Sequence, residues 1–189
     1  MRPLGNVLIT GGASGLGAAT VEAVLAAGGR LQAVFTAAEI DSCGSFGEVP
    51  ADEWERVIAV NLLGTARVVR AALPHLERSR GTLVTCSSTL GLRVFPDATA
   101  YCAAKFGVIG FTRALAAETA GRIGVTLLIP GGMHTPFFDG RDEQYKPPPD
   151  AKLNHPQDVA AAVIHALCQP SGCEVREMVV CSSQESSWP

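Results

Sequence analysis

The chain has 189 residues, of which 47% are hydrophobic and 17% are charged, and its formal net charge is −3. This length suits one folded domain with a substantial core and leaves little room for a second, so we treat residues 1–189 as one domain. The apolar content argues against disorder. The interspersed charges form no basic stripe, which argues against a nucleic-acid partner.

The cysteine and histidine pattern indicates neither a disulfide framework nor a metal centre. The six cysteines form no Cys-x-x-Cys pair, and His165 and Cys168 lie three residues apart without a second pair of ligands. We therefore expect reduced, mostly buried thiols in a cytoplasmic protein, and no metal.

Residues 5–29 carry a single acid and no base, yet we do not expect them to cross a membrane. They contain seven glycines, and their strictly apolar run covers only residues 7–9, whereas a spanning helix needs about 20 mostly apolar residues. No basic segment of the usual kind precedes them, so a signal peptide is not expected either.

Hydrophobic runs and glycine punctuation predict alternating strands and helices along the first half of the chain. In order, these are a buried strand at 6–10, a helix at 15–27 ended by Gly28-Gly29, a strand at 31–37, a loop at 41–50 and a helix at 51–76. Acids in the first turn of the last helix suit its dipole, and Pro74 is expected to kink its end.

The same alternation continues in the second half. The predicted elements are a strand at 82–87, a helix at 99–120, a strand at 125–129, a loop or lid at 131–155, a helix at 156–167 and a strand at 177–181. Strands that alternate with helices argue for an α/β fold with a parallel sheet.

A glycine-rich turn, Thr10-Gly-Gly-Ala-Ser-Gly-Leu-Gly17, joins the first predicted strand to its helix. Glycine lets the backbone turn sharply and approach a phosphate closely, and the helix N-terminus offers free N–H groups to an anion. The turn therefore indicates a phosphate site, although a tight turn that binds nothing has the same composition.

Tyr101 and Lys105 are four residues apart in a predicted helix and so lie on one face. A nearby ammonium group lowers the pKa of a phenol from its usual value of about 10, which makes it a usable proton donor or acceptor. Ser88 lies at the end of a predicted strand, where α/β sheets place their ligands. A surface Tyr–Lys pair is the alternative for these two residues taken alone.

Together these features resemble the short-chain dehydrogenase/reductase family over nearly the whole chain. Five motifs stand in the family's order: Thr10-Gly11-x-x-x-Gly15-x-Gly17, Trp54 with Asn61-Leu62-x-Gly64, Ser87-Ser88-x-x-Gly91, Tyr101-x-x-x-Lys105, and Pro130-Gly131-x-x-x-Thr135. The resemblance implies a Rossmann-type, three-layer parallel sheet. It also implies an oxidoreductase that transfers a hydride between NAD or NADP and a secondary alcohol or ketone.

The resemblance assigns a role to each matching residue. Tyr101 is the general acid/base, Lys105 lowers its pKa and binds the nicotinamide ribose, Ser88 orients the substrate oxygen, and Asn61 holds a water that links Lys105 to solvent. Besides Tyr101 and Lys105, the cofactor-binding residues it implies are Gly11, Ser14, Gly15, Leu16, Gly17, Thr36, Ala37, Ala38, Pro130, Gly131, Met133 and Thr135. Candidates for the substrate wall are Phe95, Phe137, Phe138 and Tyr145.

The chain departs from the family in two places. The predicted first helix runs almost directly into a strand that ends in Thr36-Ala37-Ala38-Glu39, which stands at the family's Asn-Asn-Ala-Gly turn. At least one βαβ unit of roughly 30 residues is therefore missing, so we expect five strands. Glu39 takes the place of the family's glycine. In a rival register, residues 31–38 are the family's second strand and Glu39 reads the adenosine ribose.

The missing unit leaves the apolar strand at 6–10 on the sheet edge, where it invites pairing with another chain. Either a partner covers this edge, or the natural protein contains a segment that this chain lacks. A homodimer or homotetramer through the helices at 51–76 and 99–120 is expected from the resemblance. The alternative to an enzyme is a degenerate family member that binds cofactor weakly or not at all and acts as an oligomeric scaffold.

Overall fold

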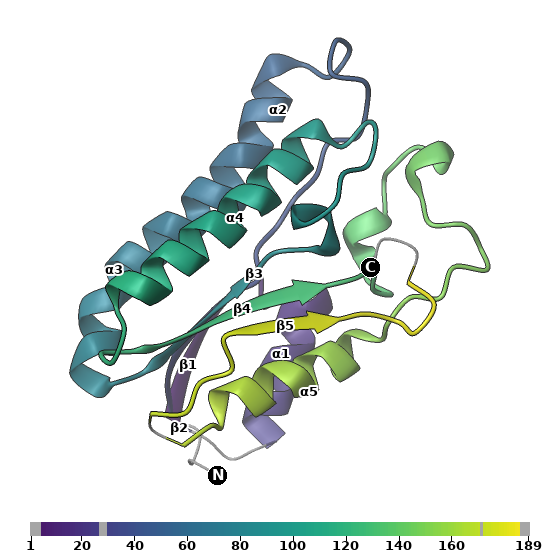
Figure 1. Cartoon of the computed structure of the whole chain (residues 1–189). Helices are drawn as coiled ribbons and strands as arrows, with labels where there is room; N and C mark the ends of the chain where they lie inside the picture. Colours follow the sequence, from purple (N-terminus) through teal and green to yellow (C-terminus); the bar gives the residue numbers. More distant parts are fainter. Residues whose placement is uncertain (1–4, 27–29, 171, 186–189) are drawn as a thin grey trace.

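The computed structural model describes residues 5–26, 30–170 and 172–185 (Figure 1). The predicted helix end at Gly28-Gly29 lies outside these residues. The strands are β1 (Gly5–Thr10), β2 (Arg30–Thr36), β3 (Thr82–Cys86), β4 (Gly124–Pro130) and β5 (Glu177–Val180). The α-helices are α1 (Gly15–Ala26), α2 (Ala51–Ile58), α3 (Thr65–Ser79), α4 (Thr99–Glu118) and α5 (Pro156–Leu167).

The five strands form one parallel sheet in the order β1-β2-β3-β4-β5. This confirms the expected Rossmann-type sheet of five strands. β2 lies between β1 and β3. In a doubly wound sheet of strand order 3-2-1-4-5-6, the first strand lies between the second and the fourth, so β2 stands in the place of the fourth strand. The rival register, with residues 31–38 as that second strand, is therefore wrong.

Helices cover both faces of the sheet and make a three-layer molecule (Figure 1). On the side of α1 and α5, Phe35, Val84 and Leu128 are fully buried. On the side of α3 and α4, buried side chains from the neighbouring strands β2, β3 and β4 meet those helices; these are Val34, Leu83 and Val125. Both faces of the central strands are thus apolar, as parallel sheets require.

Residues 51–79 form one continuous helical run, because a π-helical turn, η1 (Ala59–Gly64), joins α2 to α3. The helix passes Pro74 and ends at Ser79, where Arg80 takes a left-handed φ of 48°. The predicted end at residue 76 is therefore too early. The carbonyl that Pro74 leaves without an N–H partner belongs to the exposed Arg70, so water can hydrogen-bond it.

The run Ala51–Ser79 is long and apolar enough to cross a membrane by length and composition alone. Its inner face packs in this structure, however, with Val57, Val69 and Leu76 each no more than 3% exposed. Arg56, Arg67 and other charged residues occur along the same run. This distribution is typical of an amphipathic helix that covers one face of a sheet.

The six cysteines are free thiols, of which three are buried, two are partly buried and Cys173 is exposed. The expectation of mostly buried thiols therefore holds for half of them. Within the described ranges, no group of three or more His, Cys, Asp or Glu side chains lies close enough to hold a metal ion.

We predict that Gly17→Ala in α1 destabilises the fold, whereas Gly110→Ala in α4 does not. A Cβ on Gly17 would overlap the carbonyl oxygen of Gly11, but a Cβ on Gly110 would meet nothing within 4 Å. Overpacking costs about 1–3 kcal/mol, while replacing an exposed helical glycine with alanine gains roughly 0.5–1 kcal/mol. Urea unfolding of both variants measures the contrast, and equal stabilities would contradict it.

Candidate active site

The predicted catalytic residues meet at the carboxyl edge of the sheet. Ser88 follows β3, while Tyr101 and Lys105 lie on the face of α4 that turns toward β3. The loop after β2 brings Glu39 to the same place. The carboxyl ends of β1, β2 and β3 are aligned in register, so the segments that follow these strands converge.

The ammonium group of Lys105 is buried and paired. The residue is 2% exposed, and its Nζ donates to Glu39 Oε2 at 2.5 Å and to the carbonyl oxygen of Cys86 at 3.2 Å. Burial by itself would lower the pKa of Lys105, but the attraction and hydrogen bond of the Glu39 carboxylate outweigh it and raise that pKa above its usual value. The lysine therefore carries its proton and a matching counter-charge.

Tyr101 shares the same carboxylate oxygen. Its hydroxyl donates to Glu39 Oε2 at 3.2 Å, and its ring is 5% exposed. Burial raises the pKa of Tyr101 well above its usual value, the Glu39 charge raises it further, and a hydrogen bond with Ser88 acts in the opposite direction. The expectation that Lys105 lowers this pKa is therefore wrong for the structure as it stands, because burial and, after it, the Glu39 charge raise the pKa of Tyr101.

The two serines after β3 hold the site in different ways. Ser87 is fully buried, and its hydroxyl donates to the carbonyl oxygen of Lys105 at 2.9 Å, which fixes β3 against α4. The Ser88 hydroxyl accepts from the backbone N–H of Leu90 at 3.1 Å and caps the short helix η2 (Thr89–Gly91). The cap fixes the side chain of Ser88 beside Tyr101.

Asn61 sits in the π-helical turn η1 and is 2% exposed. Its side-chain amide donates to the carbonyl oxygen of Ile40 at 2.8 Å and accepts from the N–H of Ile40 at 2.9 Å. Single π-helical turns are common at functional sites. Here the turn presents an amide that fixes the backbone immediately after Glu39, so Asn61 positions that glutamate.

The glycine turn and the loop after β2 lie against each other. Gly11 has a φ of +69°, and a Cβ there would meet the backbone of Ala38 at 2.9 Å. The N–H of Ala38 donates to Thr10 Oγ1 at 3.3 Å. On the other side of the turn, a Cβ on Gly15 would meet Thr135 at 3.3 Å.

The structure thus brings together the predicted cofactor-binding residues from three separate segments. Ser14, Leu16 and Gly17 belong to the turn or the start of α1. Thr36 and Ala37 stand at the end of β2 or just after it. Pro130, Gly131 and Met133 end β4 or follow it.

A second carboxylate, which the sequence did not predict, lies against the segment after β4. Glu185 Oε2 accepts from the N–H of Gly132 at 2.9 Å, and a Cβ on Gly131 would overlap the same oxygen. The sequence gives no signal for this contact, because Glu185 lies in a polar tail more than 50 residues from its partner.

The lid closes over Tyr101 through one aromatic ring. The centroid of Phe137, in the short helix η3 (Pro136–Phe138), lies 5.6 Å from that of Tyr101, and Phe138 packs against Phe137. Arg141 donates to Asp41 Oδ2 at 3.0 Å, and its guanidinium lies over the Phe137 ring at 4.6 Å. The sequence analysis did not foresee this ion pair, which fastens the lid to the loop after β2.

The other two candidates for the substrate wall lie differently. Phe95 is 61% exposed. Tyr145 belongs to the short helix η4 (Glu143–Tyr145), and its carbonyl oxygen accepts from Arg141 Nη1 at 3.5 Å.

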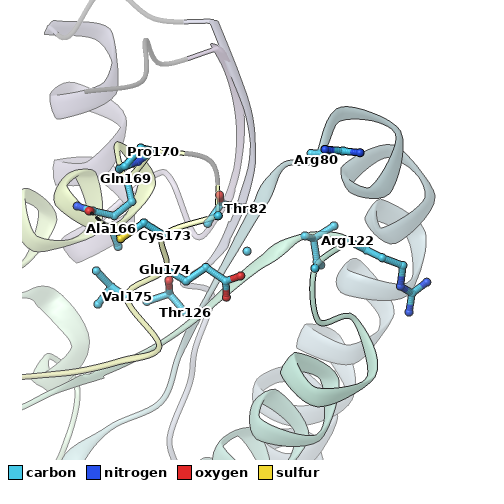
Figure 2. Close-up of a pocket in the computed structure, with 14 residues that line it drawn as sticks. Arg80, Thr82, Arg122, Thr126, Ala166, Gln169, Pro170, Cys173, Glu174 and Val175 are labelled. Carbon is cyan, nitrogen blue, oxygen red and sulfur yellow. Dashed lines mark hydrogen bonds between the residues drawn. The ribbon is translucent and has the colours of Figure 1, made fainter.

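A cavity of about 180 Å³ opens at the opposite end of the sheet (Figure 2). Its walls come from the start of β3 and β4, the end of α5 and the segment before β5, including Thr82, Gly124, Gln169 and Glu174. Ligands of α/β sheets bind outside the carboxyl ends of the strands. Since this cavity lies at the amino ends, it is separate from the cluster around Tyr101.

Residues 28–146 match the family model of the short chain dehydrogenases. An uncharacterized oxidoreductase from Staphylococcus aureus (strain MW2) is 40% identical over 131 residues, which cover 68% of this chain and 54% of that protein. A glycine betaine reductase from Emericella nidulans is 35% identical over 136 residues, or 68% of this chain and 11% of that protein. The chain thus spans about half the length, or less, of these curated relatives.

Solved structures resemble the fold over nearly its whole length. A 3-oxoacyl-[acyl-carrier protein] reductase from Brucella melitensis with bound NAD has a TM-score of 0.74 and 28% identity, covering 93% of this chain and 88% of that one. An alcohol dehydrogenase from the archaeon Thermococcus sibiricus, complexed with 5-hydroxy-NADP, has a TM-score of 0.83 and covers 98% of both chains. Its identity of 19% supports a likeness of fold alone.

We predict that Asn61→Asp lowers the free energy of unfolding by about 1–3 kcal/mol, the cost of leaving a buried polar group unsatisfied. The new carboxylate can still accept from the N–H of Ile40, but it faces the carbonyl oxygen of Ile40 without a proton to donate. Asn154→Asp, which removes a similar amide donor from the carbonyl of Val180 at a less buried side chain, is the matched control and should cost less. Chemical unfolding tests this, and an unchanged stability of Asn61→Asp would contradict the positioning role.

Proposed function

Because the chain belongs to the short chain dehydrogenase family, we propose that it is an NAD(P)-dependent oxidoreductase that interconverts a secondary alcohol and a ketone. The observation that carries the proposal is the convergence of Tyr101, Lys105 and Ser88 at the carboxyl edge of the sheet. The Brucella melitensis reductase that binds NAD, at 28% identity, supports the choice of a nicotinamide cofactor.

The residues around the glycine turn fit a dinucleotide. The first turn of α1 directs backbone N–H groups toward a possible pyrophosphate, and Gly11 and Gly17 allow the close approach of the backbone. Thr36 Oγ1, at the end of β2, is buried without a hydrogen-bond partner among the described residues. A buried polar atom of this kind is stabilised when a ligand supplies the missing bond.

In the proposed mechanism a bound cofactor would supply the hydride in ketone reduction and accept it in alcohol oxidation, and the protein positions the substrate and moves a proton. Ser88 donates a hydrogen bond to the substrate oxygen. Tyr101 gives its phenolic proton to that oxygen in ketone reduction and takes it back in alcohol oxidation. Lys105 would hold the nicotinamide ribose and stabilise the phenolate, while Phe137 excludes water from the phenol.

We further propose a cytoplasmic homo-oligomer with no nucleic-acid or membrane partner. Leu63 on η1 and Phe106 on α4 are each 44% exposed, and their two elements pack together. A subunit contact through these two elements would cover both side chains. Sedimentation as a monomer at micromolar concentration would contradict the oligomer. No observation favours the alternative of a scaffold that binds no cofactor.

We predict that Tyr101→Phe abolishes turnover with both NADH and NADPH over a panel of small ketones. The variant loses the transferable proton but keeps the ring that packs against Phe137, so its thermal unfolding curve should remain cooperative. A loss of about 10²-fold or more is expected for a missing general acid. Turnover equal to that of the unmodified chain, in a folded variant, would refute the role of Tyr101.

A further inference from the structure

We propose that Glu39 is an internal competitor of the cofactor: its carboxylate occupies the binding position formed by Lys105 Nζ and the Tyr101 hydroxyl, and it sets the affinity of this site for nicotinamide nucleotides. The inference rests on the proposed function. It assigns to Glu39 a role that follows from its contacts in this chain.

One carboxylate oxygen engages both groups. Glu39 Oε2 accepts from Lys105 Nζ at 2.5 Å and from the Tyr101 hydroxyl at 3.2 Å. The ammonium also donates to the carbonyl oxygen of Cys86 at 3.2 Å. A ribose hydroxyl that bridges Lys105 and Tyr101 in the same way would take the place of this oxygen.

Glu39 is the member of the cluster that can move. Its side chain is 21% exposed, whereas that of Lys105 is 2% exposed. The backbone on either side of Glu39 is held by hydrogen bonds. The N–H of Ala38 donates to Thr10 Oγ1, and the N–H and carbonyl of Ile40 both bond to the side-chain amide of Asn61. Rotation of the Glu39 side chain into water is thus the route that frees the site without unfolding the loop.

Displacement of Glu39 also changes the charge that Tyr101 experiences. Burial raises the pKa of the Cys86 thiol, on β3, to about 12, so this neighbour stays neutral. Asp41, on the same loop as Glu39, is paired with Arg141 of the lid. Once Glu39 leaves, the Lys105 ammonium becomes the dominant charge beside the phenol and favours the phenolate. Cofactor binding would therefore activate Tyr101 by removing Glu39.

The first test measures NADH and NADPH binding by fluorescence titration. Glu39→Gly removes the competitor, Glu39→Gln keeps its size without its charge, and Glu55→Gln removes one charge from an exposed position on α2 as the matched control. The reference is whichever of NADH and NADPH the unmodified chain binds more tightly. We expect both Glu39 variants to bind that cofactor about tenfold to a hundredfold more tightly than the unmodified chain does, the range of one charge-assisted hydrogen bond. Glu55→Gln should bind like the unmodified chain.

The outcomes separate the inference from the proposed function. Equal or weaker binding by the Glu39 variants, with the unmodified chain still binding, would overturn the role of Glu39 and leave the enzyme proposal intact. Binding by the variants alone would support the competitor. Failure of every protein to bind either cofactor at millimolar concentration would overturn the proposed function, and the competitor role with it.

The second test uses no ligand and follows the ionisation of Tyr101 directly. The chain contains two tyrosines, so one substitution leaves Tyr101 as its only phenol. In a Tyr145→Phe background, alkaline difference absorbance reports the ionisation of Tyr101 alone. Glu39→Gln should move this ionisation to lower pH by about one unit or more, since a negative charge within hydrogen-bond distance of the phenol is lost. An unchanged titration in a folded variant would show that Glu39 does not control the charge at Tyr101.

Discussion

The arrangement of this site depends on the counter-charge of one buried ammonium group. The ammonium of a lysine that is 2% exposed needs hydrogen-bond partners in place of water, and Glu39 provides one of opposite charge at 2.5 Å. The position of Glu39 in turn depends on Asn61, which holds the backbone of Ile40. The π-helical turn, the loop after β2 and α4 are thus linked through one ion pair.

The same ion pair changes the chemistry of the tyrosine. A lysine beside a phenol ordinarily makes the phenol more acidic, but here burial and a carboxylate that touches both groups raise the pKa of Tyr101 instead. In the candidate site the charge of Lys105 is therefore balanced by Glu39. Glu39 keeps the buried ammonium of Lys105 paired until a ligand binds. The ligand must then displace Glu39, which lowers its affinity.

The fold was largely predictable from the sequence because its signals are local. Apolar runs of strand length and amphipathic helices identified every strand and α-helix, and the five-stranded parallel sheet followed from the motifs. The end of the helix at Ser79 was missed because Pro74 suggested an earlier end, although Arg70, whose carbonyl loses its N–H partner to Pro74, is an exposed residue. Local pattern does not show whether water can satisfy that group.

The sequence predicted that Tyr101 and Lys105 lie together in the candidate site, but it did not predict the carboxylates that lie beside them. The spacing of Tyr101 and Lys105 predicted a shared helical face, and the structure confirms it. The contacts of Glu39, Glu185 and the Asp41–Arg141 pair join segments that lie up to 100 residues apart. Such contacts depend on how loops cross the end of the sheet, which no periodicity encodes.

The central claim is that a nicotinamide cofactor and the Glu39 carboxylate exclude each other at Lys105. A crystal structure of the chain soaked with NADH or NADPH tests it most directly. The account predicts that the Glu39 side chain turns toward solvent while a ribose hydroxyl takes its place on Lys105 and Tyr101. A bound cofactor with Glu39 still paired to Lys105 at its present distance would contradict the account.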